Sequence, residues 1–454
     1  MLFNSYAFIL GFMPLTLLLF HGLRAAGLAR SSIGLLALLS LGFYGWWNPI
    51  YLLLIVPLIV VNFALAASIV PRAGWRPRAA KPLLVLGIVL SHLGLRPSHD
   101  GWDPGARPVY NLAFDGATTK EMYRYLLHAH AVRRLRQVVL GLDTYHATLA
   151  PATARPDFDP HLLDSPGVLA LPSLLRADLK VFTSLDTLRA SLATVRSQSD
   201  REPQWFAPDG QRLGEVFFRR AGENFERLGP RGYFEEIDRL EVGFKREGQL
   251  AANAQGPGRT AQPPTAASET SVDYIRHIVA FCRAQGVDLR IFVAPEHAHQ
   301  LEITAAIGEW VTLENAKRAL VQLLAEDAAR HPGAPPIPLW DFSGYSSVTT
   351  EALPESGGHA EMEFYWDSSH FKDIVGEFVL DRLFGLSHPR REVSPDFGVR
   401  LTPATIEPTL ARLRADQLAY RRSHPEDLAW IRSLIDGTAP HPGDLGVVAS
   451  RRPR

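Results

Sequence analysis

The chain has 454 residues, and its 47 basic and 47 acidic side chains give a formal net charge of +0. A balanced charge argues against a protein dedicated to nucleic acid, which normally carries a basic excess. The one cysteine, Cys282, excludes an internal disulfide and a cysteine-rich metal site, and its apolar surroundings predict that it is buried. The length allows a membrane segment with one large soluble domain, or two small ones.

The N-terminal part has the composition of a membrane segment. Histidine aside, Arg24 and Arg30 are the only charged side chains between residues 1 and 67. Apolar stretches cover residues 2–20, 33–47 and 50–70, with a shorter one at 82–95. We expect three or four transmembrane helices. A cleaved signal peptide is the alternative for the first stretch, but that stretch lacks a basic start and further spans follow it.

Short basic loops predict the orientation of these helices. Arg24 and Arg30 follow the first stretch, and a second basic group lies between residues 72 and 81. The positive-inside rule places both loops in the cytoplasm. The chain after residues 82–95 is then outside the cytoplasm if that stretch crosses the membrane, and inside if it does not. We expect residues 82–95 to cross the membrane, which places the soluble domain outside the cytoplasm.

Short motifs in this segment carry a family resemblance. Residues 1–8 read MLFNSYAF, residues 43–49 read FYGWWNP, and residues 61–63 read VNF. Over about residues 1–95 the chain closely resembles the opening of bacterial membrane-bound O-acyltransferases, in the branch that acetylates alginate and related polysaccharides. The resemblance implies a bacterial inner membrane, and the expected crossing of residues 82–95 then places the soluble domain in the periplasm. The further spans and the buried catalytic histidine of that family do not follow, so we interpret the segment as an anchor.

From about residue 108 the sequence alternates short apolar runs with amphipathic segments. This alternation predicts a parallel sheet covered on both faces by helices. The expected strands cover residues 109–114, 137–142, 289–294 and 338–342. The expected helices cover residues 120–131, 271–284, 310–330, 374–384, 410–420 and 425–434.

The predicted fold class is α/β, with N-terminal transmembrane helices followed by a doubly wound, flavodoxin-like parallel-sheet domain. The sheet domain covers residues 96–390, and a helical tail covers residues 391–454. A long insertion occupies about residues 144–270. Its end, residues 251–268, has the composition of a disordered loop, because it is rich in Gly, Pro and Ala.

The strongest chemical signal in the sequence is Asp367-Ser368-Ser369-His370, just ahead of an expected helix. An aspartate three residues before a histidine lets the carboxylate orient the imidazole as a general base. Asp143 and His146 have the same spacing, so the spacing alone does not single out a site. A helix cap or a histidine at the edge of the core is the alternative for either pair.

These signals resemble the ordered blocks of SGNH (GDSL-type) esterases and acetyltransferases. Residues 110–119 resemble the second block of that family, and the resemblance implies that the amide of Gly116 donates to an oxyanion. Asp367 and His370 resemble the late Asp-x-x-His of the catalytic triad. The resemblance therefore implies an SGNH-type domain with ester chemistry.

The block around Gly141 and Asp143 departs from the family pattern. It resembles the third block, which would place both residues at the substrate, but Asp143 stands where the family has asparagine. A carboxylate cannot donate to an oxyanion, and its charge would repel one. A strand-end aspartate that caps the next turn is the alternative.

The nucleophile block is incomplete. No Gly-Asp-Ser precedes Gly116, and the candidate serines are Ser91 and Ser98. Ser98, in the run RPSHDG, is the better candidate, and a plain loop serine before an Asp-Gly turn is the alternative. Because the two family resemblances meet here, we interpret the chain as a fusion of neighbouring genes from one polysaccharide-acetylation cluster.

No metal site is expected in this sequence. His297 and His299 could share one face of an extended chain, but no third ligand is identifiable, and a polar loop is the alternative.

The leading functional interpretation is a membrane-anchored protein that acts in O-acetylation or deacetylation of an exported polysaccharide. Ser98 would be acylated, His370 would act as the base, Asp367 would orient it, and Gly116 would donate to the oxyanion. No cofactor is implied. The expected partners are the membrane, a polysaccharide or acylated glycan, and a full-length membrane-bound O-acyltransferase, with no nucleic acid. A catalytically inactive glycan-binding or scaffold protein of the same assembly is the alternative, and an inert fusion is a third possibility.

Overall fold

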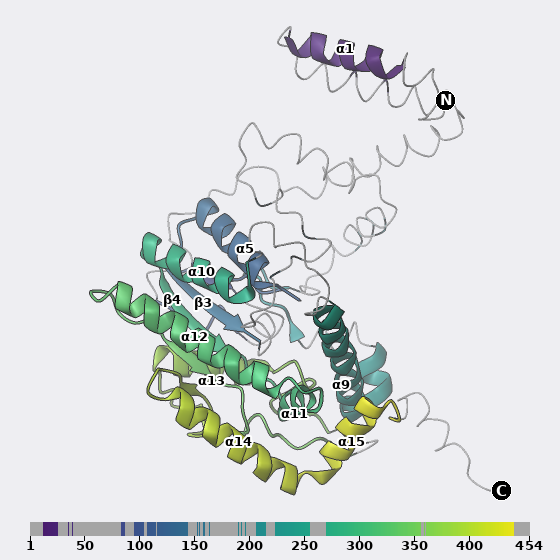
Figure 1. Cartoon of the computed structure of the whole chain (residues 1–454), viewed down its shortest axis with the longest axis vertical. Coiled ribbons are helices and arrows are strands. Elements are labelled where there is room, and N and C mark those ends of the chain that lie inside the picture. The colour runs from purple at the N-terminus through teal and green to yellow at the C-terminus, as the bar shows by residue number, and fades with distance from the viewer. Residues whose placement is uncertain are drawn as a thin grey trace, which may run out of the picture. The chain divides into compact units, whose positions relative to one another are not determined.

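The computed structural model describes residues 12–25, 83–86, 95–103, 107–114, 116–143, 206–214, 223–254, 269–355 and 360–439, with a few isolated positions between them. The chain divides into two compact units. One consists of Met1–Arg76 and Pro166–Glu202, and the other of Pro77–Ser165 and Pro203–Arg454. In the first unit the described helix is α1, Met13–Ala25 (Figure 1). The rest of the description concerns the second unit.

A six-stranded sheet with the order β2-β1-β3-β4-β5-β6 lies at the centre of this unit. The strands are β1 (Leu83–Leu86), β2 (Val109–Asn111), β3 (Gln137–Leu142), β4 (Asp288–Val293), β5 (Leu339–Asp341) and β6 (Val399–Arg400). The first five run parallel, and β6 joins β5 antiparallel. The β3–β4 ladder extends from the Gln137–Asp288 pair to the Leu142–Val293 pair.

Helices make up most of the regular structure around this sheet. They are α5 (Thr119–Val132), α9 (Glu223–Ala254), α10 (Ser271–Gln285), α11 (Ala298–Ala306), α12 (Trp310–Arg330), α13 (Asp373–Phe384), α14 (Ile406–Ser423) and α15 (Pro425–Asp436). Local sequence explains several of their ends. Thr118 and Thr270 begin α5 and α10 as capping boxes, and Gly286 ends α10 in the left-handed conformation that suits glycine.

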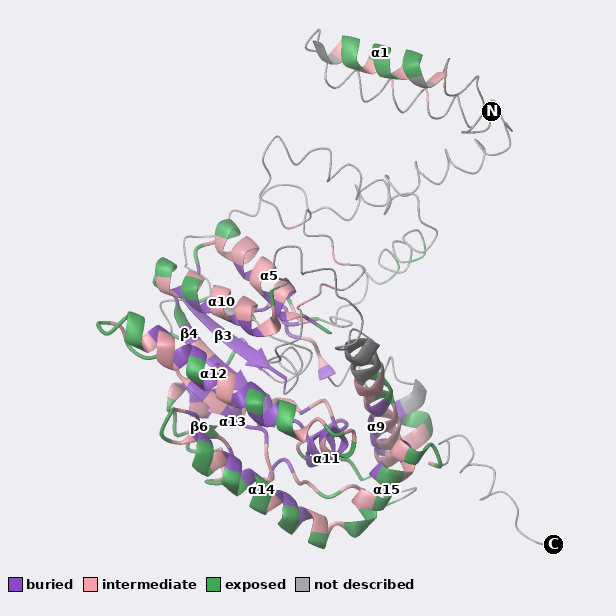
Figure 2. Cartoon of the chain, viewed as in Figure 1, coloured by how far each residue is buried: buried purple, intermediate pink, exposed green. Residues whose placement is uncertain are grey.

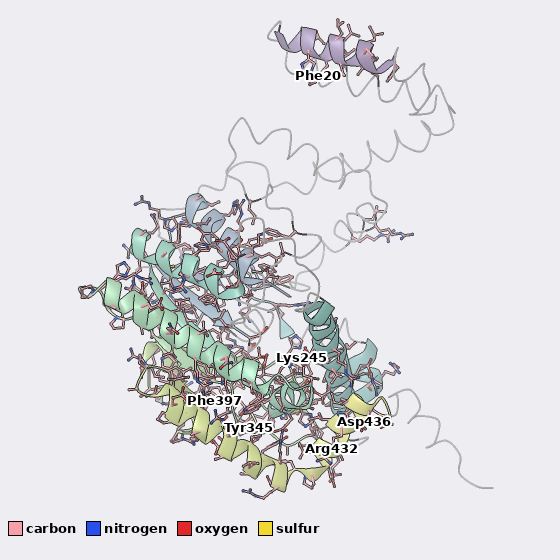
Figure 3. All side chains as sticks on the ribbon, viewed as in Figure 1. Phe20, Lys245, Tyr345, Phe397, Arg432 and Asp436 are labelled. Carbon is pink, nitrogen blue, oxygen red and sulfur yellow. The ribbon has the colours of Figure 1, made fainter. Side chains whose placement is uncertain are left out.

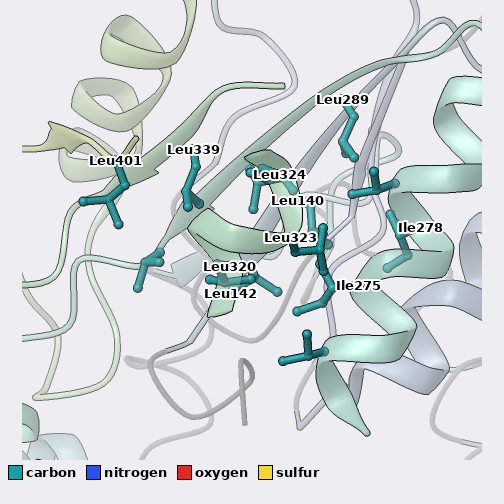
Figure 4. Close-up of a cluster of buried hydrophobic side chains, with 14 of the residues drawn as sticks. Leu140, Leu142, Ile275, Ile278, Leu289, Leu320, Leu323, Leu324, Leu339 and Leu401 are labelled. Carbon is teal, nitrogen blue, oxygen red and sulfur yellow. The ribbon is translucent and has the colours of Figure 1, made fainter. Parts of the chain in front are cut away.

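Alternate side chains of β3 and β4 enter two different hydrophobic clusters. Leu140 and Ile291 pack with side chains of α5, α10, α12 and α14 in one cluster (Figure 4). Val139 and Phe292 pack with side chains of α13 in the other. Successive strand residues point to opposite faces of a sheet, so each strand contributes to both clusters. Strand β3 is accordingly buried along its whole length, and β4 is buried at four of its six residues (Figure 2).

The expected fold class, transmembrane helices followed by a doubly wound parallel-sheet domain, is wrong. Within the described ranges, no helix has both the length and the apolar character that a membrane crossing requires. The sheet is mixed, because β6 pairs with β5 in the antiparallel direction at one edge. The two residues of β6 are exposed, so no apolar run in the sequence predicts this strand. Its strands have two to six residues, whereas α9 and α12 have 32 and 21. A small mixed sheet within a largely helical unit is the observed architecture.

Strand β1 corrects one expected membrane span. Residues 82–95 were expected to cross the bilayer, but Leu83–Leu86 pair with β2 on one side and β3 on the other. A short apolar run fits a buried parallel strand as well as part of a span, and sequence alone does not separate the two. The periplasmic placement depended on this crossing and loses that support. Apart from two isolated positions, the expected spans at 33–47 and 50–70 lie outside the described residues.

The expected insertion contains the long helix α9. Gly229, with φ of 71°, and Pro230 interrupt it near its start. Lys245 of α9 donates from Nζ to Gln300 Oε1 at 2.8 Å and to Thr304 Oγ1 at 3.1 Å, which ties α9 to α11 (Figure 3). Residues 251–254 end α9, and the remainder of the expected disordered loop, 255–268, lies outside the described residues.

Cys282 is buried in α10, as the sequence predicts, with 1% of its surface exposed. Burial raises the pKa of its thiol to about 12.

Candidate functional site

Asp367 and His370 form a hydrogen-bonded pair. Both carboxylate oxygens of Asp367 lie 2.8 Å from Nδ1 of His370. The carboxylate also accepts hydrogen bonds from the backbone amides of Ser369 and His370, at 2.8 and 2.9 Å. The side chain of Asp367 is fully buried, whereas 17% of the His370 side chain is exposed. The carboxylate therefore fixes the ring through Nδ1, and Nε2 is the atom that could accept a proton.

The turn that carries this pair is attached to the segment after β4. The Tyr365 hydroxyl donates to the carbonyl of Pro295 at 2.8 Å. The amide of His297 donates to the carbonyl of Ser368 at 3.1 Å. Because Pro295 and His297 directly follow β4, the pair lies at the carboxyl edge of the parallel strands, where open sheets commonly place their sites.

Helix α9 contributes residues beside the pair that the sequence did not predict. Ser369 Oγ donates to Glu241 at 2.7 Å, which holds the turn to α9. Tyr233 lies close enough to Asp367 for an electrostatic interaction with its carboxylate. Burial raises the pKa of Tyr233, and the Asp367 carboxylate raises it further, against an opposing effect of Arg212. The Tyr233 hydroxyl therefore stays protonated and can act as a hydrogen-bond donor.

A small aromatic cluster adjoins the same turn. Phe225, Tyr233 and Trp366 pack together, and the rings of Phe225 and Trp366 are 6.2 Å apart. Nζ of Lys372 lies 4.5 Å from the centre of the Trp366 ring. Trp366 and Lys372 lie within a few residues of His370 in the sequence, and Phe225 and Tyr233 pack on Trp366. Apolar rings and a cation together can hold a substrate with both apolar and anionic parts.

Ser98 is placed along α13 by its neighbours. Arg96 donates to Asp373 at the start of that helix, at 2.6 and 2.9 Å. His99 Nε2 lies 3.1 Å from Asp381, eight residues further along, which is about 12 Å of helix. Ser98 is exposed, and no hydrogen bond between its hydroxyl and His370 occurs among the residues that are described. Its role as nucleophile stays a prediction.

The three residues expected at an oxyanion site lie at β2 and β3, two strands that β1 separates. Gly116 is an exposed turn residue with φ of 63° between β2 and α5. Asp143 is buried directly after β3. Both therefore lie at the carboxyl edge that also carries the Asp367–His370 turn. Gly141 lies within β3 and pairs with Phe292, so it belongs to the ladder.

His297 and His299 bind different partners. His297 Nε2 lies 2.9 Å from the carbonyl oxygen of Glu351, and His299 Nδ1 lies 2.8 Å from Asp238. A search of the described residues for three or more side chains able to hold a metal ion finds no such group. Both histidines are part of the packed interior at the start of α11.

The His299 ring joins three helices. Its Nδ1 meets Asp238 of α9, and its Nε2 lies 3.5 Å from Asp427 of α15. Burial lowers the pKa of His299, but the two carboxylates outweigh burial and raise this pKa to about 9. Asp427, whose carboxyl also accepts a hydrogen bond from Tyr420 at 2.8 Å, has its pKa lowered to about 2, because its bonds to His299 and Tyr420 outweigh burial. Burial first, and then the charge of His299, lower the pKa of His297 to about 3.

No protein-family model matches the chain, and no curated protein matches it. The case for a function therefore rests on the residues themselves.

Proposed function

We propose that this chain processes esters on an exported polysaccharide, removing or transferring acetyl groups, with His370 as general base and Asp367 as the residue that orients it. The observation that carries the proposal is the buried Asp367 carboxylate, with both oxygens 2.8 Å from Nδ1 of a partly exposed histidine. Attachment to a membrane and association with a full-length membrane-bound O-acyltransferase belong to the proposal. The motifs in residues 1–95 support them.

The proposed chemistry needs one proton transfer at Nε2 of His370. That atom takes the proton of a hydroxyl group, either of water or of Ser98, as its oxygen attacks the ester carbonyl. The proton is then passed to the departing sugar oxygen, so that water as nucleophile yields acetate and a free sugar hydroxyl. With Ser98 as nucleophile, the acetyl group stays on the serine oxygen until water or an acceptor hydroxyl, deprotonated by the same nitrogen, takes it and the serine regains its proton. Asp367 stabilises the imidazolium that exists between these steps. Water as the nucleophile is supported by Ser98, whose hydroxyl makes no hydrogen bond to His370 among the described residues.

A second candidate is a glycan-binding protein without catalysis. The observation that favours it is that Ser98 is exposed and that its hydroxyl makes no hydrogen bond to His370 among the described residues. In that case the Asp367–His370 pair would mainly stabilise the turn against α9 and the segment after β4.

Acetate release from an acetylated xylan, measured on the purified full chain, separates these candidates. We expect His370→Ala to lower kcat by at least about 1,000-fold, and Asp367→Asn to lower it by about 100- to 10,000-fold, since asparagine lacks the negative charge that stabilises the imidazolium and can hold the ring in the wrong tautomer. His331→Ala is the matched control. Nδ1 of His331 also faces an aspartate, Asp327, at 3.2 Å, but this pair lies at the end of α12.

Each outcome of this assay has a distinct meaning. Full activity of Ser98→Ala shows that water is the nucleophile, and loss of activity assigns that role to Ser98. Equal losses in His331→Ala and His370→Ala would contradict the proposed base. A wild type that binds the acetylated glycan but releases no acetate would favour the non-catalytic candidate.

A further inference from the structure

A pocket of about 410 Å³ lies between α5 and α10, which pack side by side (Figure 1). Its lining includes Lys120, Tyr123, Arg124, Glu269, Tyr274 and His277. The volume is within the range of pockets that hold small molecules. None of these residues takes part in the ester chemistry described above.

Two cations face this pocket from α5. Lys120 and Arg124 are four residues apart, so they lie on the same face of the helix, one turn from each other. Nζ of Lys120 is 6.0 Å from the centre of the Tyr274 ring on α10, and the side chains of both cations are half-buried. Two fixed positive charges in a partly enclosed space favour an anionic ligand.

Three rings from the two helices form the pocket wall. The Tyr123 and Tyr274 rings are 6.1 Å apart at 51°, the Tyr274 and His277 rings are 5.7 Å apart at 75°, and the Tyr123 and His277 rings are 5.5 Å apart at 31°. Rings at such angles do not form the parallel slot in which a flat nucleobase stacks. They offer single aromatic faces, against which the C–H face of a pyranose can pack.

A carboxylate completes the pocket's polar lining. Glu269 Oε1 lies 2.6 Å from Nε2 of His277, and its hydrogen bonds from His277 and then Tyr274 lower its pKa. The charged Glu269 side chain is therefore engaged by neighbouring donors, and its remaining lone pairs can accept hydrogen bonds from hydroxyl groups.

A phosphate at the start of α5 fits the structure less well. Thr118 and Glu121 form a capping box there, in which Thr118 Oγ1 accepts from the Glu121 amide and the Glu121 carboxylate accepts from the Thr118 amide. These helix-terminal donors are already satisfied, so the pocket's attraction for an anion comes from its side chains.

We propose that this pocket binds a sugar acid, a pyranose that carries a carboxylate. The carboxylate pairs with Lys120 and Arg124, a C–H face of the ring packs on Tyr274, and hydroxyl groups reach Glu269 and His277. This inference goes beyond the proposed ester chemistry and does not depend on it.

Calorimetric titration of the full chain with tetragalacturonate, and with neutral maltotetraose of the same length, tests the proposal. We expect binding of the acidic tetramer, weakened by salt, and little binding of the neutral one. Lys120→Ala/Arg124→Ala weakens binding by at least about 10-fold, because charge-assisted hydrogen bonds are lost. Tyr274→Ala also weakens it, with the salt dependence retained.

Two controls separate this site from general effects. Arg412→Ala removes an exposed arginine of α14 that pairs with Asp416 at 3.3 Å, and it should bind as the wild type does. His370→Ala should also bind normally, which separates this inference from the proposed catalysis. Lys120→Gln/Arg124→Gln keeps the side-chain stems and serves if the alanine double variant unfolds.

Four results would overturn the proposal. The first is equal affinity for maltotetraose and tetragalacturonate. The second is tighter binding of adenosine monophosphate than of the sugar acid. The third is unchanged affinity of a folded Lys120/Arg124 double variant. The fourth is a loss of affinity in Arg412→Ala as large as in that double variant.

Discussion

The buried His299 side chain makes the stability of this unit depend on pH. An ordinary histidine has a pKa near 6.5, and the Asp238 and Asp427 carboxylates raise that of His299 to about 9. A raised pKa in the folded state means that the protonated ring stabilises folding fully below about pH 6.5, and that this contribution disappears as the pH rises through 9. His297 acts in the other direction, because its pKa of about 3 means that unfolding takes up a proton below pH 6.5.

We therefore expect the free energy of unfolding to fall by roughly 3 kcal/mol between pH 6.5 and pH 9.5. Urea unfolding at several pH values measures this change. His299→Gln should flatten the curve in the same interval, because it removes the titrating ring. A stability that stays constant or rises over that interval in the wild type would refute the assignment.

Sequence spacing together with the expected helix indicated the contact between Asp367 and His370, which the structure contains, but not the residues around it. Four-residue motifs report on neighbours along the chain, and this pair is local. Tyr233 and Glu241 reach the same turn from more than a hundred residues away, on a helix whose pattern is interrupted by Gly229 and Pro230. Nothing in a single sequence indicates such a contact.

At the scale of elements, β1 is an interior strand that joins β2 to the rest of the sheet. It lies between β2 and β3 and bonds to both, so the sheet would be split without it. Its residues, Leu83–Leu86, come from a stretch that also suits a membrane span.

Val85→Pro tests the strand directly. Val85 pairs with Asn111 on one side and Val139 on the other, and proline removes an amide from the ladder. We expect a loss of at least about 1–3 kcal/mol in unfolding free energy, the cost of leaving a buried backbone group unsatisfied. Ser387→Pro is the control, because Ser387 is exposed in the loop after α13 and its amide donates no hydrogen bond among the described residues. Equal urea midpoints for the two variants would argue that residues 83–86 are not in the sheet.

Elements with a simple pattern were predictable, and those fixed by distant partners were not. The predicted strand 137–142 coincides with β3, and the predicted helix 310–330 coincides with α12. Helix α11 escaped prediction because it is buried on all sides, so its polar residues do not alternate with apolar ones. His299, Gln300 and Glu302 are satisfied by Asp238, Lys245 and Arg421 from other parts of the chain.

For the whole second unit, the two hydrophobic clusters share one sheet. Leu410 of α14 is buried in the first cluster and Leu380 of α13 in the second, both with no exposed surface. Since β3 and β4 contribute to both clusters, unfolding of one face should disrupt the other.

Leu410→Ala and Leu380→Ala should each cost about 2–5 kcal/mol and shift one common urea transition. Because the two leucines lie in different clusters, their effects should add within about 0.5 kcal/mol in the double variant. Leu418→Ala, with 56% of the leucine exposed, is the control and should change stability by less than about 0.5 kcal/mol. Two separate transitions, seen by circular dichroism and by tryptophan fluorescence, would contradict this expectation.

The overall fold class was the least predictable property, for a physical reason. Apolar runs of similar length serve as strands in a protein interior and as parts of membrane helices, and a single sequence does not state which solvent surrounds them. The sequence also gives no indication of β6. Its two residues are exposed, and it forms a strand only by pairing with β5, nearly sixty residues earlier.

The buried thiol of Cys282 provides a chemical probe for local unfolding of the protein. It is the chain's one cysteine, it lies on α10 inside the first cluster, and its pKa of about 12 keeps it almost wholly in the unreactive protonated form. An alkylating reagent should therefore react only after the helix has separated from the sheet. The rate of mass increase in native buffer would then report how often this side of the molecule opens, without any added label.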